Sequence, residues 1–263
     1  MPSMRHVVHI MAACTLLATA ACSDRVTAPR ATIHYLGHSA FVFTFDNGLT
    51  VLTDYGKSRA YGLDSPIFGL GGLRPDVMTR SHDHPDHAGG SLPDGYGQLV
   101  TDGGRFEGNG LTITPIPTFE GTLDTADNTS YLFEYRGVKI LHLGDCQALI
   151  VAIEDSVVQE RVRTLYPDSY DLVLVPIGFV RDIVDEAAQF VTLLDARRVI
   201  PMHYWNPADR DTFLELLENQ GDARGRRYRV RAEQGATLRL DRIAEADSVV
   251  EAIGLTPGPL RLR

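Results

Sequence analysis

The segment at residues 81–87 constrains this chain more than any other part of its sequence. It reads Ser-His-Asp-His-Pro-Asp-His, so three imidazoles and two carboxylates stand within six residues, and His82, His84, Asp86 and His87 are the candidate ligands. The short apolar run at residues 75–79 predicts a strand that delivers this cluster into a tight turn. Imidazole and carboxylate are normal ligands of zinc and similar divalent ions, so the cluster predicts a metal site. The alternative is a polar loop with chance histidines, which this density of ligands disfavours.

The first half of the chain has the pattern of short strands. Apolar runs at residues 33–36, 40–45 and 49–53 are separated by turn signals, including the hairpin pair Asn47-Gly48. Residues 56–74 are rich in glycine and predict a long loop, which in a compact domain is usually functional or mobile. Further strands are expected at residues 97–101, 111–117, 130–136 and 138–143.

Helical and strand patterns alternate in the second half. Helices are expected at residues 147–165, 182–195 and 208–219, the second of them with Asp182 as its N-cap. Strands are expected at residues 172–176, 199–203, 228–232 and 236–240. This order favours an α/β fold in which two mixed β-sheets form a sandwich flanked by helices. Neither an internal repeat nor an interdomain linker stands out, so residues 31–263 are interpreted as one domain.

The N-terminus has the pattern of a targeting segment. Residues 1–21 combine Arg5 with an apolar stretch and end in small residues, as signal peptides do. Cys22 follows and residues 22–30 form a polar tether, so the segment resembles a bacterial lipoprotein signal in which the cysteine is lipidated. We expect a lipid anchor that holds the body in the cell envelope, on the outer-membrane or periplasmic side. A plain secretory signal and an uncleaved apolar N-terminus are the alternatives.

The net charge and the cysteine content exclude some classes of function and of structural site. The formal net charge is −9, and an acidic chain lacks the positive field that nonspecific binding to nucleic acid needs. We therefore expect a small-molecule substrate and no nucleic-acid partner. Beyond the leader only Cys146 remains, so an internal disulfide or a zinc-finger cluster cannot form.

The His-x-His-x-Asp-His spacing resembles the signature of the metallo-β-lactamase superfamily. Within it, the chain is similar to the ascorbate-6-phosphate lactonase-like branch and its uncharacterised metal-dependent hydrolase relatives. Five landmarks in the same order carry the resemblance: residues 35–41 (Tyr-Leu-Gly-His-Ser-Ala-Phe), 52–54 (Leu-Thr-Asp), 143–145 (Leu-Gly-Asp), 175–178 (Val-Pro-Ile-Gly) and 200–204 (Ile-Pro-Met-His-Tyr). The resemblance extends along most of the chain after the leader and implies the superfamily's αββα sandwich.

The resemblance also implies a ligand set for two divalent metal ions. His82 and His84 would bind the first ion, and Asp86, His87 and His203 the second, with Asp145 as the bridging carboxylate. Zinc is expected first, with manganese or iron as alternatives. Hydroxide held between two cations is a nucleophile near neutral pH, and Asp86 or Asp145 would handle the proton as catalytic residues.

One position departs from the family's pattern. The third ligand of the first ion is a histidine in the family, whereas here Glu120 stands in its place within Pro-Thr-Phe-Glu-Gly-Thr. Glu120 then binds the first ion as an oxygen ligand, or that ion is weak or absent, or another residue fills the place. An oxygen donor would favour manganese or iron over an all-imidazole site.

Two neighbouring residues have alternative interpretations. Asp54 matches a family position that supports the ligands by hydrogen bonding, although a simple turn aspartate would give the same pattern. His38 either lies at the pocket edge or is a buried histidine in a turn between strands.

The predicted activity is metal-dependent hydrolysis of a lactone, another ester or a phosphodiester. Two other classes remain open. A protein with a degraded first site would bind metal or sense a ligand without turnover. A di-iron redox site, known elsewhere in the superfamily, usually brings a flavin domain for which this chain has no room.

Overall fold

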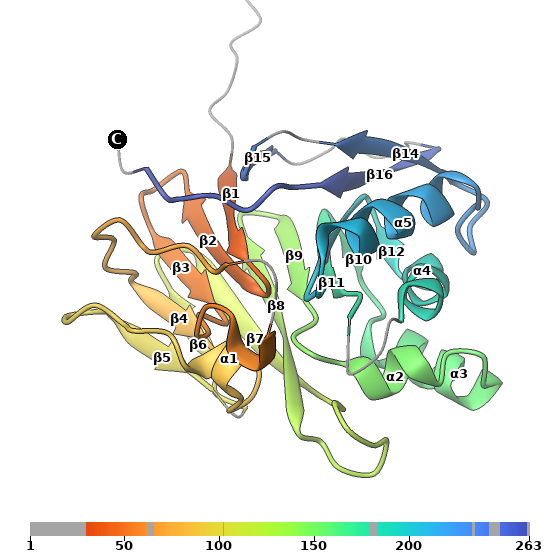
Figure 1. The fold of residues 1–263 in the computed structure, drawn as a ribbon, viewed down its shortest axis with the longest axis horizontal. Helices are drawn as coiled ribbons and strands as arrows, with labels where there is room; N and C mark the ends of the chain where they lie inside the picture. Colours follow the sequence, from red (N-terminus) through yellow and green to blue (C-terminus); the bar gives the residue numbers. More distant parts are fainter. Residues whose placement is uncertain are drawn as a thin grey trace, which may run out of the picture.

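Two large β-sheets packed face to face form the centre of the molecule (Figure 1). The computed structural model describes residues 30–62, 66–101, 103–178, 183–232, 235–241 and 248–261. The predicted signal peptide, the tether up to residue 29 and the proposed cap Asp182 lie outside the described residues. The predicted fold class is confirmed: both sheets are mixed, and the described helices lie on the outside of the sandwich.

The six-stranded sheet comes mainly from the first hundred residues. Its order is β15-β1-β2-β3-β4-β5. The strands β1, β2 and β3 form the antiparallel meander that the apolar runs predict, and β4 and β5 then add in parallel. Their bounds are Ala31–Gly37 for β1, Ala40–Phe45 for β2, Thr50–Thr53 for β3, Val77–Thr79 for β4, Gln98–Val100 for β5 and Thr237–Leu240 for β15.

The eight-stranded sheet has the order β14-β16-β13-β11-β9-β8-β7-β6. The strands β6 to β9, which come first in the sequence, pair antiparallel, whereas β9, β11, β13, β16 and β14 run parallel. The bounds are Phe106–Gly108 for β6, Leu111–Thr118 for β7, Asn128–Tyr135 for β8, Val138–His142 for β9, Leu172–Pro176 for β11, Arg198–Met202 for β13, Arg227–Ala232 for β14 and Val249–Gly254 for β16. The short strands β10 (Ser169–Tyr170) and β12 (Asp195–Ala196) pair separately.

Four helices lie beside the eight-stranded sheet: α2 (Gln147–Val151), α3 (Ser156–Leu165), α4 (Val184–Thr192) and α5 (Pro207–Glu218) (Figure 1). The single helix predicted at residues 147–165 is two helices, because the chain turns before Asp155, whose carboxylate caps α3 by accepting from Val157 N at 2.8 Å. At α5 the Asn206 and Asp209 side chains form a capping box. None of the described helices is long and apolar enough to cross a membrane.

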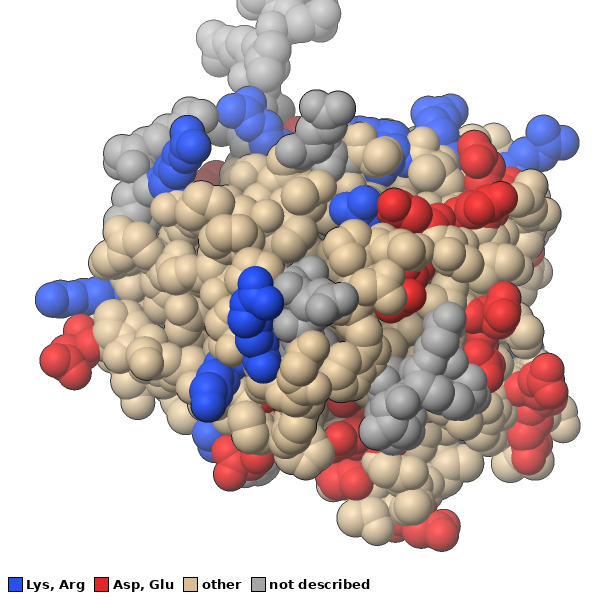
Figure 2. Space-filling model, in the orientation of Figure 1, with Lys and Arg blue, Asp and Glu red and all other residues tan. Residues whose placement is uncertain are grey.

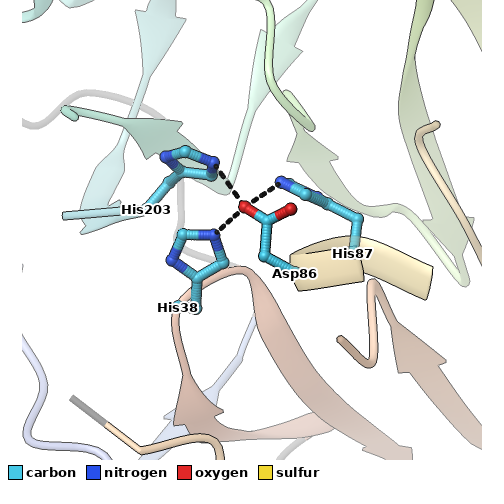
Figure 3. A group of neighbouring side chains, drawn as sticks. All are labelled: His38, Asp86, His87 and His203. Carbon is cyan, nitrogen blue, oxygen red and sulfur yellow. Dashed lines mark hydrogen bonds and ion pairs between the residues drawn. The ribbon is translucent and has the colours of Figure 1, made fainter. Parts of the chain in front are cut away.

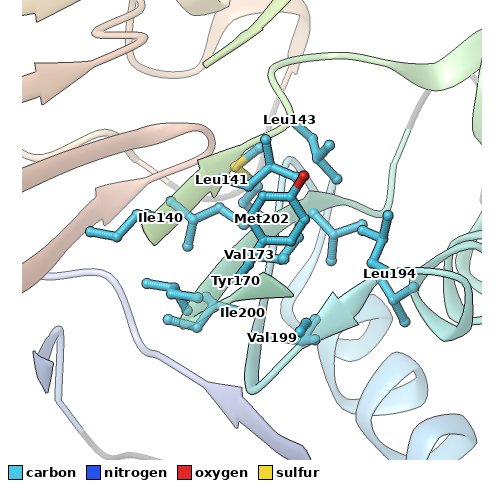
Figure 4. Packing of buried hydrophobic residues seen from close by; sticks show 14 of the residues in the cluster. Ile140, Leu141, Leu143, Tyr170, Val173, Leu194, Val199, Ile200 and Met202 are labelled. Carbon is cyan, nitrogen blue, oxygen red and sulfur yellow. The ribbon is translucent and has the colours of Figure 1, made fainter. Parts of the chain in front are cut away.

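The parallel strands of the eight-stranded sheet are covered on both faces. Every residue of β11 is buried, because sheet packs on one face and helices on the other. Figure 4 shows Leu141, Val173 and Ile200 from three neighbouring strands packed within this core. Between the sheets, the rings of Phe43 and Phe133 meet edge to face with centroids 5.1 Å apart.

Loop and tail residues cover part of the outer face of the six-stranded sheet. Leu36, Val42 and Leu52 on that face form a second apolar cluster with Ile67 and Leu70. Both covering residues belong to the loop predicted at residues 56–74, and Leu260 near the C-terminus packs on the same cluster. This long loop therefore completes a hydrophobic core. The described part of it also holds a one-turn helix, η1 (Ala60–Gly62).

Strand ends converge at one edge of the sandwich. The segment after β4 enters the short helix α1 (Pro85–Ala88), which carries Asp86 and His87. Asp145 follows β9 and His203 follows β13, two strands that flank β11 in the parallel part of the other sheet. Carboxyl ends of parallel strands meet at one edge, so residues far apart in sequence come together there.

The close packing of Gly56 on α1 gives a test of this arrangement. A Cβ atom at Gly56 would lie 1.6 Å from the backbone oxygen of Asp86, so Gly56→Ala must displace the backbone of α1. We expect a loss of roughly 2 kcal/mol or more in the free energy of unfolding, measured by urea denaturation. Gly69→Ala is the control, because a Cβ atom there has no atom within 4 Å and the loss should stay within about 0.5 kcal/mol. Equal losses in the two variants would contradict the packing described.

Candidate metal centre

The imidazoles of the second predicted metal site surround one carboxylate oxygen. Asp86 Oδ2 lies 3.6 Å from His87 Nε2 and 3.7 Å from His203 Nε2 (Figure 3). His38 Nε2, which the sequence left open, lies 3.0 Å from the same oxygen. All four side chains are buried, and their ligand atoms lie within 4.8 Å of one another. The structure thus joins the predicted ligands of the second ion and adds His38.

The first predicted site is more exposed. His84 Nδ1 lies 3.1 Å from one oxygen of Glu120, and His82 Nε2 lies 3.6 Å from the other. His82 is buried, Glu120 is half-buried and His84 is exposed. Glu120 follows β7 and meets the histidine turn, as the family pattern implies for the third ligand. Its role as a ligand stays a prediction, but the structure puts its carboxylate where that role requires it.

Asp145 lies between the two groups. Its Oδ2 atom is 3.3 Å from His203 Nε2, and its carboxylate also forms a three-residue group with His82 and His87. Asp145 N donates to Asn128 Oδ1 at 2.8 Å, and the Gln147 side-chain amide donates to Asp145 Oδ1 and to Gly178 O. The resemblance implies a bridging carboxylate at Asp145, and its position between the two groups agrees with that expectation.

Asp54 supports the histidine turn from the end of β3. Its Oδ2 atom accepts from His87 Nδ1 at 2.9 Å and from the Ser81 hydroxyl at 2.7 Å, and its Oδ1 accepts from Ser81 N at 2.8 Å. In the neutral ring the bond to Nδ1 fixes the tautomer of His87, so that Nε2 would offer its lone pair to a cation. The geometry agrees with the supporting role rather than with a simple turn aspartate.

Burial and hydrogen bonding shift the ionisation of these groups. Burial would lower the pKa of His87, yet its bond to Asp54 and the nearby carboxylates raise the pKa to about 9. Burial and the charge of His87 lower the pKa of His82 to about 4. Burial and then the charge of Asp145 raise the pKa of Glu120 to about 7. Although burial opposes it, the bond from His38 keeps the pKa of Asp86 below its usual range, so Asp86 is ionised at neutral pH.

Three residues of this centre have a strained, left-handed backbone. His38, Asp54 and His203 have positive φ angles of 54°, 37° and 54°. Such conformations cost an ordinary residue about 1–3 kcal/mol and persist only where surrounding contacts impose them. Gly144, with φ of 61°, leads into Asp145, and a Cβ atom there would lie 2.6 Å from Ser81 Cβ. These turns place side chains from both sheets within contact of each other.

The donor atoms fit a cation. Among the described residues, His82 Nε2, His87 Nε2, His203 Nε2 and Asp86 Oδ1 are buried without a hydrogen-bond partner. Buried polar atoms are normally paired, so a cluster of unpartnered imidazole nitrogens beside carboxylates has the chemistry of a metal site. Nitrogen and oxygen donors suit zinc, manganese and iron.

Some residues of the site gave little signal in the sequence. Gln147 and Asn128 hold Asp145, and Ser81 bonds Asp54, but single polar residues in helices and strands carry no recognisable pattern. His142 is buried with Nε2 at 3.0 Å from Ser39 O and belongs to none of the three candidate ligand groups. Burial raises the pKa of Cys146, which agrees with a packing role and not with a nucleophile.

The fold and the candidate metal centre agree with one class of protein, the metallo-β-lactamase superfamily. The model of the family described as the beta-lactamase superfamily domain matches residues 32–203, and the chain belongs to this family.

Relatives of known sequence and structure agree with this assignment. The chain is 27% identical to a UPF0173 metal-dependent hydrolase of Thermococcus onnurineus, over 72% of this chain and 93% of that protein. It is 25% identical to a protein of the same name from Thermus thermophilus, over 82% and 99%. Among solved structures, a candidate Zn-dependent hydrolase of the superfamily from Thermotoga maritima matches with a TM-score of 0.57 and 24% identity, over 86% and 100%.

The Asp54 carboxylate offers a test of the site's support. An amide oxygen accepts a hydrogen bond more weakly than a carboxylate does, so Asp54→Asn should orient His87 less firmly. We expect its affinity for Zn²⁺ to fall about 10- to 100-fold, measured by competition with a chromophoric chelator. Asp46→Asn, in the turn between β2 and β3, is the matched control and should bind like wild type. Unchanged affinity in Asp54→Asn would contradict the supporting role.

Proposed function

We propose that this protein is a two-metal hydrolase that acts on a lactone, another ester or a phosphodiester. The observation that carries the proposal is the pair of ligand groups that share the neighbourhood of Asp145. One group contains His82, His84 and Glu120, and the other contains Asp86, His87 and His203. Two ligand groups with a carboxylate between them are the arrangement that hydrolysis with two cations uses.

The residues of the site have different roles in the proposed reaction. Bound divalent cations would supply Lewis acidity, which lowers the pKa of water and polarises the oxygen under attack. Asp145 lies between the two ligand groups, so its carboxylate is placed to accept the proton that the attacking water loses. Asp86 would keep its negative charge beside the imidazoles. Gln147 and Asn128 would hold Asp145 in place while it does this.

Glu120 bears on which metal is bound. Its carboxylate gives the first site an oxygen donor beside two imidazoles, which hardens that site. Zinc remains the first expectation for the pair, and manganese or iron is the alternative for the Glu120 site. The same feature supports the second candidate function, a protein that binds metal or senses a ligand without turnover because its first site holds metal weakly.

Metal content and turnover test the proposal together. Wild type should hold two metals per chain and hydrolyse members of a lactone, ester and phosphodiester panel. Glu120→Ala should hold about one, and Asp145→Ala should lose turnover by on the order of 10²-fold or more. Glu154→Ala is the control, because Glu154 is exposed in the turn before α3. Metal would be measured by inductively coupled plasma mass spectrometry.

The alternative results separate the candidates. One tightly held metal in wild type and in Glu120→Ala, with no turnover on the panel, would favour the non-catalytic protein. A visible iron absorbance would favour redox chemistry. A folded wild type without metal would overturn the proposal.

We also propose that the protein is held at a membrane in the cell envelope by a lipid on Cys22. The apolar segment at residues 7–21 and the polar tether support this. Arg30, the first described residue, precedes β1, which pairs with β15. Arg227, Arg229 and Arg239 are exposed on β14 and β15. Figure 2 shows Lys and Arg along the upper edge, where Figure 1 places these strands, and such charge suits anionic lipid headgroups.

Cys22→Ser tests the anchor in cells. Without the acceptor thiol no lipid can be attached, so the protein should move from the membrane fraction to the soluble fraction, as followed by immunoblotting. Cys14→Ser, within the leader, is the control and should leave the protein in the membrane fraction. Equal partition of wild type and Cys22→Ser would refute the lipid anchor.

A further inference from the structure

His38 occupies an unexplained place at the second metal site. It lies in the turn between β1 and β2, outside the histidine turn that supplies the neighbouring ligands. The residue is 3% exposed, and the centroid of its ring lies 4.0 Å from the centroid of the His203 ring. Its Nε2 atom approaches Asp86 Oδ2 to 3.0 Å, which is closer than either of the other two imidazoles.

Hydrogen bonds define which ring nitrogen carries the proton in the two expected ligands. His87 donates from Nδ1 to Asp54 Oδ2 at 2.9 Å, and His203 donates from Nδ1 to Gly178 O at 3.1 Å. In a neutral imidazole with Nδ1 protonated, Nε2 is a lone pair. In the neutral form that a metal ligand must have, both rings therefore present the Nε2 lone pair beside Asp86.

His38 has the opposite arrangement. Its Nε2 faces an ionised carboxylate, which only accepts hydrogen bonds, so in the neutral ring Nε2 carries the proton. Its Nδ1 is buried and has no hydrogen-bond partner among the described residues. A ring that points N–H at the site is a donor to Asp86 and not a further ligand.

No other described residue shares with His38 the task of hydrogen-bonding the Asp86 carboxylate. In the described part of the chain, His38 is the one hydrogen-bond partner of the Asp86 carboxylate, and Asp86 Oδ1 has none. The backbone of His38 adds a second link, because its carbonyl accepts from His203 N at 3.0 Å and from the Tyr35 hydroxyl at 3.0 Å. One residue thus contacts two expected ligands that come from different sheets.

We propose that His38 is a positioning residue of the second metal site, which orients the Asp86 carboxylate through a hydrogen bond from Nε2. The inference rests on the proposed two-metal function. The bond restricts rotation of the carboxylate, so the oxygen that faces His87 and His203 stays in place before a cation arrives. Partners of this kind typically contribute 10- to 100-fold in metal affinity.

Three variants of the purified protein beginning at Ser23 test the role. The core contributed by the described residues lies between Ala31 and Leu260, so this chain retains it. His38→Ala removes the donor, and His38→Gln keeps a side-chain N–H. His34→Ala, on the strand β1 that leads into His38, is the control, because the His34 ring bonds Thr237 and Gly258 and lies away from the site. The affinities of both sites for Zn²⁺ would be measured by chelator competition, and the Co²⁺ form by visible spectroscopy and X-ray absorption.

We expect His38→Ala to bind the second metal about 10- to 100-fold more weakly, with the first metal unchanged. His38→Gln should recover most of that affinity. X-ray absorption should find the same number of imidazole nitrogens around Co²⁺ in wild type and in His38→Gln. A lost imidazole in His38→Gln would show that His38 is a ligand and overturn the proposal. Wild-type affinity in a folded His38→Ala would overturn it too. Absence of a second metal in wild type would instead overturn the proposed two-metal function, before any variant is compared.

Discussion

The hydrogen bond between the buried Asp54 carboxylate and His87 Nδ1 is the contact on which the candidate site depends. Both side chains are fully shielded from solvent, and a buried charge is tolerated only when it is paired and hydrogen-bonded. The bond joins the end of β3 to α1 and selects the tautomer of His87. Ser81 adds two bonds to the same carboxylate, so the start of the histidine turn is fixed as well.

Each sheet supplies part of the site, and neither is sufficient alone. The six-stranded sheet and its connections contribute His38, Asp54 and the histidine turn, whereas Glu120, Asp145 and His203 follow strands of the eight-stranded sheet. The distances between ligands are therefore set by how the two sheets pack. The edge-to-face contact of Phe43 with Phe133 and the aliphatic core around it serve the chemistry indirectly, because they hold the strand ends at a constant separation.

Much of this arrangement could be predicted from the sequence, because it follows local pattern. The β1–β3 meander, the buried strand β11 and the histidine turn all have short-range signals. The strand β16 was not predicted, and its place between β13 and β14 depends on pairing that the local pattern does not show. The break between α2 and α3 was also not predicted, because the apolar spacing continues through it. His38 was left open since a single histidine in a turn has no distinctive pattern, and its contact with Asp86 spans 48 residues of sequence.

The division of the ligands between two sheets has a consequence for the molecule's persistence. A cation bound by His87 and Asp145 would act as a cross-link between the layers, because the sheets could not separate without releasing it. The folded state would then gain free energy with the logarithm of the free metal concentration. Resistance to denaturation and to proteolysis would then depend on the free metal concentration of the surroundings as well as on the sequence of the chain. In an environment depleted of metal, the same protein would be shorter-lived.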